Sequence, residues 1–245
     1  MQLSGRVRNV RPSGVRKIFD LAAKVKNPIN LSIGEPDFDI PDEIKEEGIK
    51  WIRAGFNKYT PSGGIPELRE KVFCYLKGKG IICDDVIITA GATGGLLLSF
   101  LVTLDPGDEV IIPDPYFVLY EYQLILLGAR PVYVDTYPDF SLKEEKLRKA
   151  LTNKTKAILI NSPNNPTGRV YSRQELEMVV AVARERNLLI FSDDIYDRFI
   201  FEDSLRNNYL GQLYENTLTI GGFSKTWAMT GWRVGFVAGS KEIIQ

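Results

Sequence analysis

Short apolar runs alternate with helical patterns along most of the chain, and this alternation is what most restricts its fold. Runs rich in β-branched residues predict strands at residues 86–89, 109–113, 131–134, 157–161, 188–192 and 218–220. Amphipathic patterns predict helices between several of them, at residues 94–104, 117–127, 142–151 and 173–186. Continuously apolar strands are typical of a mostly parallel sheet that carries helices on both faces.

Residues 232–238 follow the sixth run too closely for a crossover helix, so they predict a seventh, antiparallel strand. The expected fold is a three-layer α/β domain with a mostly parallel, seven-stranded sheet, which occupies residues 31–245. Residues 1–30 are basic and irregular and predict an N-terminal arm or part of a smaller domain. The remaining predicted elements are helices at 15–24, 42–54 and 65–79 and a short strand at 31–33.

Polar or glycine-rich segments directly follow five of the predicted strands. They lie at residues 90–95, 113–117, 161–168, 193–196 and 221–233. In open α/β sheets the ligand binds outside the carboxyl ends of the strands. The sequence therefore predicts that these five segments line one crevice.

Lys225 is isolated from other charges in the last of these segments. Small, aromatic and hydroxyl residues surround it, and the nearest formal charge along the chain is Arg233. Burial in such surroundings lowers the pKa of a lysine amine toward neutrality, and an amine of this kind can form a Schiff base. A solvated loop lysine explains the segment equally well when it is taken alone.

Two groups of residues could bind a phosphate. Gly91, Ala92 and Thr93 precede a predicted helix, where small residues let backbone N–H groups reach an anion, although a tight turn explains them too. Arg233 with Ser224 could neutralise a phosphate, and a solvated arginine is the alternative. The glycine fingerprints of dinucleotide and P-loop sites are both missing.

Two adjacent acids, Asp193 and Asp194, end an apolar strand. Successive strand side chains point to opposite faces, so only one acid is expected in the crevice. A carboxylate there would keep a ring nitrogen protonated, whereas helix capping or solvent exposure also explains either acid. Tyr196, three residues after Asp193, could donate to a ring oxygen or simply pack.

Asn165 and Phe117 complete the candidate set. Asn165 lies in the turn-like run Asn164–Gly168, in which a side-chain amide could bind a phenolic oxygen and a substrate carboxylate. Phe117 could stack on a planar ring or belong to the core. Together the candidates offer an amine for an aldehyde, an acid for a pyridine nitrogen, a partner for a phenolic oxygen, a stacking face and a phosphate cup. These are the requirements of pyridoxal 5'-phosphate.

Composition excludes several other classes of function. Histidine is absent, so mechanisms and metal sites that need imidazole are excluded. The 31 basic and 31 acidic residues balance, which gives no electrostatic reason to expect nucleic acid or an anionic membrane as partner. Two cysteines and no signal-type apolar run favour a reducing compartment, and we expect a cytoplasmic protein.

Five motifs, in order, resemble the class I/II aminotransferases of pyridoxal-phosphate fold type I. They are LSIGEPDF at residues 31–38, YTPSGG at 59–64, NSPNNPTG at 161–168, SKT at 224–226 and GWRVG at 231–235. The similarity covers essentially the whole chain and is closest to the aspartate and aromatic aminotransferases of archaea and thermophilic bacteria. It implies the cofactor-binding large domain of that fold and amino-group transfer from an L-amino acid to a 2-oxo acid.

The resemblance also implies roles for the residues that face the cofactor ring. Lys225 would carry the cofactor as a Schiff base and later move the substrate proton. Asp193 would pair with the pyridine nitrogen, and Asp194 stands where relatives often have Glu. Asn165 and Tyr196 would hydrogen-bond the ring oxygen. Phe117 would stack on the ring.

Further roles concern the phosphate, the substrate and the partner subunit. By resemblance, the phosphate would be held by Gly91, Ala92, Thr93, Ser224 and Arg233. Tyr59 would reach the phosphate of a neighbouring subunit, which implies a homodimer. Gly34 would bind the substrate carboxylate through its backbone, together with Asn165. Relatives carry a further C-terminal small domain with a substrate-binding arginine, so we expect these 245 residues to be the large domain without that part.

Three alternatives to an aminotransferase share some of these features. A C–S β-lyase or decarboxylase of the same fold type would use the same cofactor residues. A non-catalytic cofactor-binding module is the second, although related regulators usually add a DNA-binding segment, for which residues 1–30 are too short. The third, a nucleotide-binding oxidoreductase, is disfavoured because the glycine fingerprint is missing.

Overall fold

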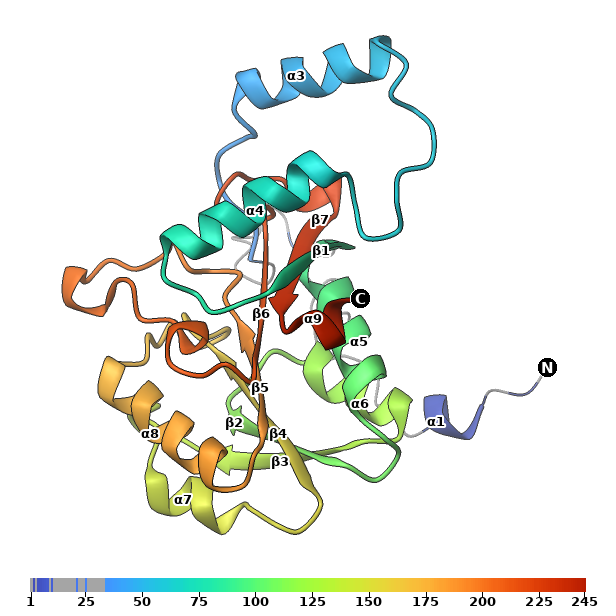
Figure 1. The fold of residues 1–245 in the computed structure, drawn as a ribbon. Helices are drawn as coiled ribbons and strands as arrows, with labels where there is room; N and C mark the ends of the chain where they lie inside the picture. Colours follow the sequence, from blue (N-terminus) through green and yellow to red (C-terminus); the bar gives the residue numbers. More distant parts are fainter. Residues whose placement is uncertain (1, 3, 9, 11–20, 22–24, 26–33) are drawn as a thin grey trace.

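The computed structural model describes residues 2, 4–8, 10, 21, 25 and 34–245, and Figure 1 shows their arrangement. Of the helix predicted at 15–24, only residue 21 is described, and the strand predicted at 31–33 lies outside the described residues. Within the described part, no helix is long and apolar enough to cross a membrane.

A seven-stranded sheet forms the centre of the domain, in the order β1-β7-β6-β5-β4-β2-β3. Its strands are β1 (Asp85–Ala90), β2 (Glu109–Asp114), β3 (Arg130–Asp135), β4 (Thr155–Asn161), β5 (Leu189–Asp193), β6 (Thr217–Gly222) and β7 (Val234–Gly239). Strand β7 is antiparallel to both of its neighbours, and the other paired strands are parallel. The prediction of a mostly parallel sheet with one antiparallel strand is confirmed.

Helices cover both faces of the sheet (Figure 1). On one face lie α5 (Gly91–Thr103) and α6 (Leu119–Leu127), and on the other lie α4 (Pro66–Gly78), α7 (Glu144–Lys149) and α8 (Arg173–Glu185). Adjacent residues of β2 show the alternation, because Ile112 packs in the core under α5 and α6 whereas Ile111 packs under α7 and α8. The three-layer prediction is therefore confirmed.

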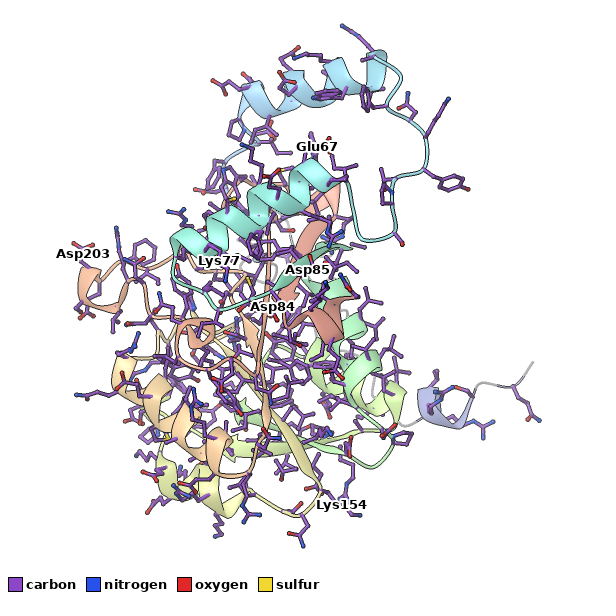
Figure 2. All side chains as sticks on the ribbon, viewed as in Figure 1. Glu67, Lys77, Asp84, Asp85, Lys154 and Asp203 are labelled. Carbon is purple, nitrogen blue, oxygen red and sulfur yellow. The ribbon has the colours of Figure 1, made fainter. Side chains whose placement is uncertain are left out.

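Helix α4 is amphipathic and covers the strands at one end of the sheet. Val72 and Leu76 are buried toward β1 and β7, while Glu67 and Lys77 are exposed on the outer side (Figure 2). Burial of each aliphatic side chain contributes on the order of 1.5–3 kcal/mol. This apolar face holds α4 against β1 and β7.

The remaining elements are short or stand apart. They are α1 (Gly5–Arg8), α3 (Asp42–Arg53), α9 (Lys241–Ile244) and the 3-10 turns η1 (Asp203–Leu205), η2 (Leu210–Gln212) and η3 (Thr230–Trp232). In Figure 1, α3 lies away from the sheet at the top of the view. Its Ile52 and the following Phe56 are well exposed.

Helix boundaries differ from the prediction by a few residues. Helix α5 begins at Gly91 and not at Gly94, because the small residues after β1 already form its first turn. Gly91 has φ +72°, a conformation that glycine adopts without strain. Helix α6 begins two residues later than predicted, and α7 is shorter at both ends. Helix α8 begins at the predicted Arg173, where Ser172 and Glu175 form a capping box.

Candidate active site

A cleft of about 640 Å³ lies at the carboxyl ends of the parallel strands. Segments that follow five strands line it, as the strand-end argument predicts. The candidates that the structure places along this cleft are Gly34, Ala92, Thr93, Phe117, Asn165, Asp193, Tyr196, Ser224, Lys225 and Arg233. A second hollow of about 740 Å³ shares Gly34, Asn165, Tyr196 and Lys225 with this cleft, so the two spaces adjoin at these residues.

Lys225 lies on the turn that follows β6, and its amine is half-buried. The amine donates a hydrogen bond to the backbone carbonyl of Gly34 and lies 5.7 Å from the centre of the Tyr196 ring. Burial lowers the pKa of Lys225, the carboxylate of Glu35 opposes this effect, and Arg233 adds to it. The expected direction is confirmed. Glu35 was not foreseen as a neighbour because it is remote in the sequence.

The two adjacent acids point to opposite faces of the sheet, as the strand alternation predicts. Asp193 lines the cleft and is only 3% exposed, whereas Asp194 lines a cavity on the other face. The hydroxyl of Tyr120 donates to Asp193 Oδ2 at 2.6 Å, and the Ile195 N–H donates to Oδ1 at 3.2 Å. Burial raises the pKa of Asp193, and these two hydrogen bonds oppose the rise because they favour the charged carboxylate.

Tyr120 is a site residue that sequence reasoning missed. It lies on α6, is fully buried, and fits the apolar pattern of that helix, so the local apolar pattern gives no sign of a role in the site. Its ring contacts that of Phe117 edge-on, with 5.6 Å between the centres. A buried tyrosine needs a hydrogen-bond partner, and its position three residues after Phe117 was the available signal.

Asn165 and Tyr196, the two candidates for one ring oxygen, contact each other. The Asn165 side-chain amide donates to the Tyr196 hydroxyl at 3.4 Å. The Asn165 backbone N–H donates to Asn161 Oδ1 at 2.7 Å, and Asn161 Nδ2 donates to the Asp193 carbonyl at 2.8 Å, so Asn161 links the turn after β4 to β5. Burial raises the pKa of Tyr196, so its hydroxyl keeps its proton and can act as a donor.

Arg233 lies against the first turn of α5, where the helix N-terminus favours anions. A Cβ added to Gly91 would lie 2.4 Å from Arg233 Nη2, so only glycine leaves room for the guanidinium. Arg233 Nη1 donates to the Thr230 carbonyl at 2.8 Å. Ser224 is buried on the facing turn. The arrangement forms a positively charged cup at one end of the cleft.

Two candidates do not line the cleft: Gly91, which packs against Arg233, and Tyr59. The side chain of Tyr59 is fully exposed, in the loop between α3 and α4. The role implied for it requires a second subunit and stays a prediction. Gly34 does reach the cleft, where a Cβ would lie 3.8 Å from the Tyr196 hydroxyl.

Comparisons with known proteins identify the family. Residues 26–245 match the family described as aminotransferase class I and II. The aspartate aminotransferase of Pyrococcus abyssi is 44% identical, and aromatic-amino-acid aminotransferase 2 of Thermococcus litoralis is 42% identical; each match covers 100% of this chain and 65% of the relative. A solved double mutant of Thermus thermophilus aspartate aminotransferase, 38% identical, superimposes with a TM-score of 0.94 over 100% of this chain and 66% of that chain. This chain thus spans about 65% of the length of these curated relatives. It belongs to the class I and II aminotransferase family.

Proposed function

We propose that this chain is the cofactor-binding part of an amino-acid aminotransferase, which transfers an amino group from an L-amino acid to a 2-oxo acid. The observation that carries the proposal is that Lys225, Asp193 and Arg233 line a single cleft. Relatives are named aspartate and aromatic-amino-acid aminotransferases, so amino acids with acidic or aromatic side chains are the first substrates to test.

The cleft fits pyridoxal 5'-phosphate, the cofactor of this family. Asp193 is a buried acid whose carboxylate accepts hydrogen bonds from Tyr120 and the Ile195 N–H. Such a carboxylate suits a partner for the pyridine nitrogen. The space that Gly91 leaves for Arg233 suits a phosphate at the N-terminus of α5. The other proposed contacts are Asn165 and Tyr196 at the ring oxygen, Phe117 at the ring face, and Ala92, Thr93 and Ser224 at the phosphate.

When bound, the cofactor supplies an aldehyde that binds amines covalently and an electron-poor ring that accepts the electron pair of the substrate α-carbon. The protein supplies the proton transfers. The lowered pKa of Lys225 leaves more of its amine neutral, so Nζ can accept the proton from the substrate α-carbon and return it. Hydrogen bonds from the Tyr120 hydroxyl and the Ile195 N–H stabilise the carboxylate form of Asp193 against burial, which raises its pKa.

A homodimer and a cytoplasmic location are further parts of the proposal. Support for the dimer comes from α3 and the loop after it, which lie away from the sheet (Figure 1) and expose Phe56 and Tyr59. In the dimer, Tyr59 of one subunit would reach the phosphate of the other. The cytoplasmic location rests on composition, with two cysteines, both of them free.

The test of the cofactor site is reduction of the reconstituted protein with borohydride, followed by peptide mass analysis. We expect the cofactor to be attached to Lys225 in the native chain and in Lys154→Ala, which removes an exposed lysine (Figure 2). In Lys225→Ala both the covalent attachment and the pH-sensitive absorbance of the Schiff base between the cofactor and the lysine should disappear. Retention of that absorbance in Lys225→Ala would rule out the assignment.

The reaction is tested separately, with aspartate or phenylalanine as amino donor and 2-oxoglutarate as acceptor. Formation of glutamate only when a donor is present supports the aminotransferase. Pyruvate release from a cysteine conjugate without any oxo-acid acceptor would indicate the C–S β-lyase instead.

A further inference from the structure

Two buried polar side chains, Tyr120 and Gln123, lie three residues apart on α6 and so share one side of that helix. Tyr120 donates to Asp193, the acid in the cleft. Gln123 reaches in another direction, toward the start of α5, where the cleft has its positively charged cup. One side of α6 therefore contacts the elements at both ends of the cleft.

Gln123 binds the first turn of α5 through the backbone. Its Nε2 donates to the Thr93 carbonyl at 3.0 Å, and the two helices lie on the same face of the sheet (Figure 1). Thr93 belongs to the turn that begins at Gly91. The N–H groups at the start of a helix have no partner within it, so they are the donors that an anion uses. The hydrogen bond from Gln123 thus fixes the position of a turn that carries such donors.

The other atom of the Gln123 amide contributes nothing to stability. Its Oε1 is buried and has no hydrogen-bond partner among the described residues. A buried polar atom without a partner destabilises the folded state, whereas an apolar side chain of similar shape can be neutral or stabilising at such a position. The amide therefore gives the fold little net stability, and its specific contribution is the contact with Thr93.

Other buried hydroxyls along α5 bind only within that helix. Ser99 Oγ donates to the Gly95 carbonyl at 2.8 Å, and Thr103 Oγ1 donates to the Ser99 carbonyl at 2.6 Å. Neither bond can hold α5 relative to another element. Within the part of the chain that the structure describes, only Gln123 joins α6 to α5 by a side-chain hydrogen bond.

We propose that Gln123 is a positioning residue for the cofactor phosphate. Through the Thr93 carbonyl it holds the first turn of α5, so that the free N–H groups of that turn and the guanidinium of Arg233 meet the phosphate together. Arg233 packs against Gly91 of the same turn, so a shift of the turn would disturb both groups. The inference rests on the proposed cofactor site, in which Tyr120 supports the ring end of the cleft and Gln123 supports the phosphate end.

The test compares pyridoxal 5'-phosphate with pyridoxal, which has the same ring and aldehyde but no phosphate. Absorbance titration of the 245-residue chain gives both affinities. In Gln123→Met, which keeps the length of the side chain and removes the donor, affinity for pyridoxal 5'-phosphate should fall roughly tenfold, the loss of about one hydrogen bond. Affinity for pyridoxal should change less than about threefold. Ser99→Ala, the matched control, removes a donor to another α5 carbonyl and should leave the ratio of the two affinities unchanged.

Urea unfolding separates positioning from packing. The midpoint for Gln123→Met should equal or exceed that of the native chain, because the change removes the unpaired Oε1. A lower midpoint with equal losses of affinity for both ligands would make Gln123 a packing residue, and an unchanged affinity ratio would refute its role while leaving the cofactor site intact. A native chain that binds pyridoxal 5'-phosphate no better than pyridoxal would refute the phosphate site itself.

A structure of the native chain with pyridoxal 5'-phosphate bound tests the contact without any variant. We expect Gln123 Nε2 to stay within hydrogen-bond distance of the Thr93 carbonyl while the Thr93 N–H donates to the phosphate. A phosphate bound away from the first turn of α5, or a Gln123 side chain turned away from Thr93, would overturn the assignment.

Discussion

Asp193 and Asp194 follow one another at the end of β5, yet they face two different environments. Asp193 opens onto the cleft, and two donors, Tyr120 and the Ile195 N–H, hydrogen-bond its carboxylate. Asp194 faces a cavity between α4 and the sheet; Ser192 donates to one of its carboxyl oxygens, and the other has no partner among the described residues. Burial raises the pKa of both acids, but only Asp193 has both of its oxygens paired.

The difference shows that burial alone does not define a functional acid. An acid that must hold a charge against a cofactor needs donors that stabilise the carboxylate. The hydrogen bonds of Asp193 provide that, whereas Asp194 is better suited to the neutral form. Two adjacent aspartates on one strand can therefore differ in the protonation state that their surroundings favour, because they face opposite sides of the sheet.

The largest effect is expected from a matched pair of substitutions, Asp193→Asn and Asp194→Asn. Loss of the charge that pairs with the pyridine nitrogen should cost about 3 kcal/mol, the lower end for breaking a buried pair. Pyridoxal-phosphate affinity, followed by absorbance titration, should thus fall roughly 100-fold in Asp193→Asn. Asp194→Asn should change it by less than about threefold. Similar losses in both variants would mean that the faces are not independent.

A second prediction concerns the pH dependence of stability. The folded-state pKa of Asp194, about 8, is well above its ordinary value near 3.8, so the folded protein holds this proton more tightly than the unfolded chain. Its contribution to stability is therefore fully present below about pH 4 and is lost as the pH rises toward 8.

Asparagine does not titrate, so Asp194→Asn should gain stability relative to the native chain as the pH rises from 5 to 8. The gain should reach up to about 1 kcal/mol per pH unit. Urea unfolding at several pH values measures it, and Lys154→Ala serves as the control. Parallel curves for the native chain and Asp194→Asn would show that Asp194 titrates normally.

Local patterns were enough to predict the sheet, the cleft and the opposite faces of the two acids. Each of these follows from period-two alternation and from the position of strand ends. The uncharged neighbours of Lys225 were also visible in the sequence, and they predicted that burial would lower its pKa. Most roles of the candidate residues came from the family resemblance.

Long-range packing supplied what local patterns could not. Tyr120 donates to Asp193 although it lies 73 positions earlier in the chain, on α6, and its apolar neighbours on that helix gave no sign of this contact. Glu35 comes close to Lys225 from the other end of the chain. A cavity lies between α4 and β6, lined by Leu68, Val72 and Gly221, and no periodicity in the sequence predicts such a gap.

A third prediction tests the support of Asp193 through Tyr120→Phe. This change removes a 2.6 Å hydrogen bond to a buried carboxylate, an interaction worth about 1.5–3 kcal/mol. The pKa of Asp193 should rise further, so pyridoxal-phosphate affinity should weaken roughly tenfold and its pH profile should move to higher pH. Affinity titrations between pH 6 and 9 provide the measurement. If the pH profile of pyridoxal-phosphate affinity is unshifted and only the free energy of unfolding falls, Tyr120 contributes to packing and not to the charge of Asp193.

The smallest effect is expected from the matching change on the other face, Ser192→Ala. It removes the hydrogen bond from Ser192 Oγ to Asp194 Oδ1 and should lower the free energy of unfolding, measured in urea, by about 1 kcal/mol. Ser192 lies on the same face as Asp194, so the hydrogen bonds of Asp193 remain and cofactor affinity should be unchanged. Tyr120→Phe and Ser192→Ala each remove one hydroxyl group that donates a hydrogen bond to a buried acid at the end of β5. If only the first alters cofactor affinity, the sheet separates the two acids; if both do, β5 transmits changes from one face to the other.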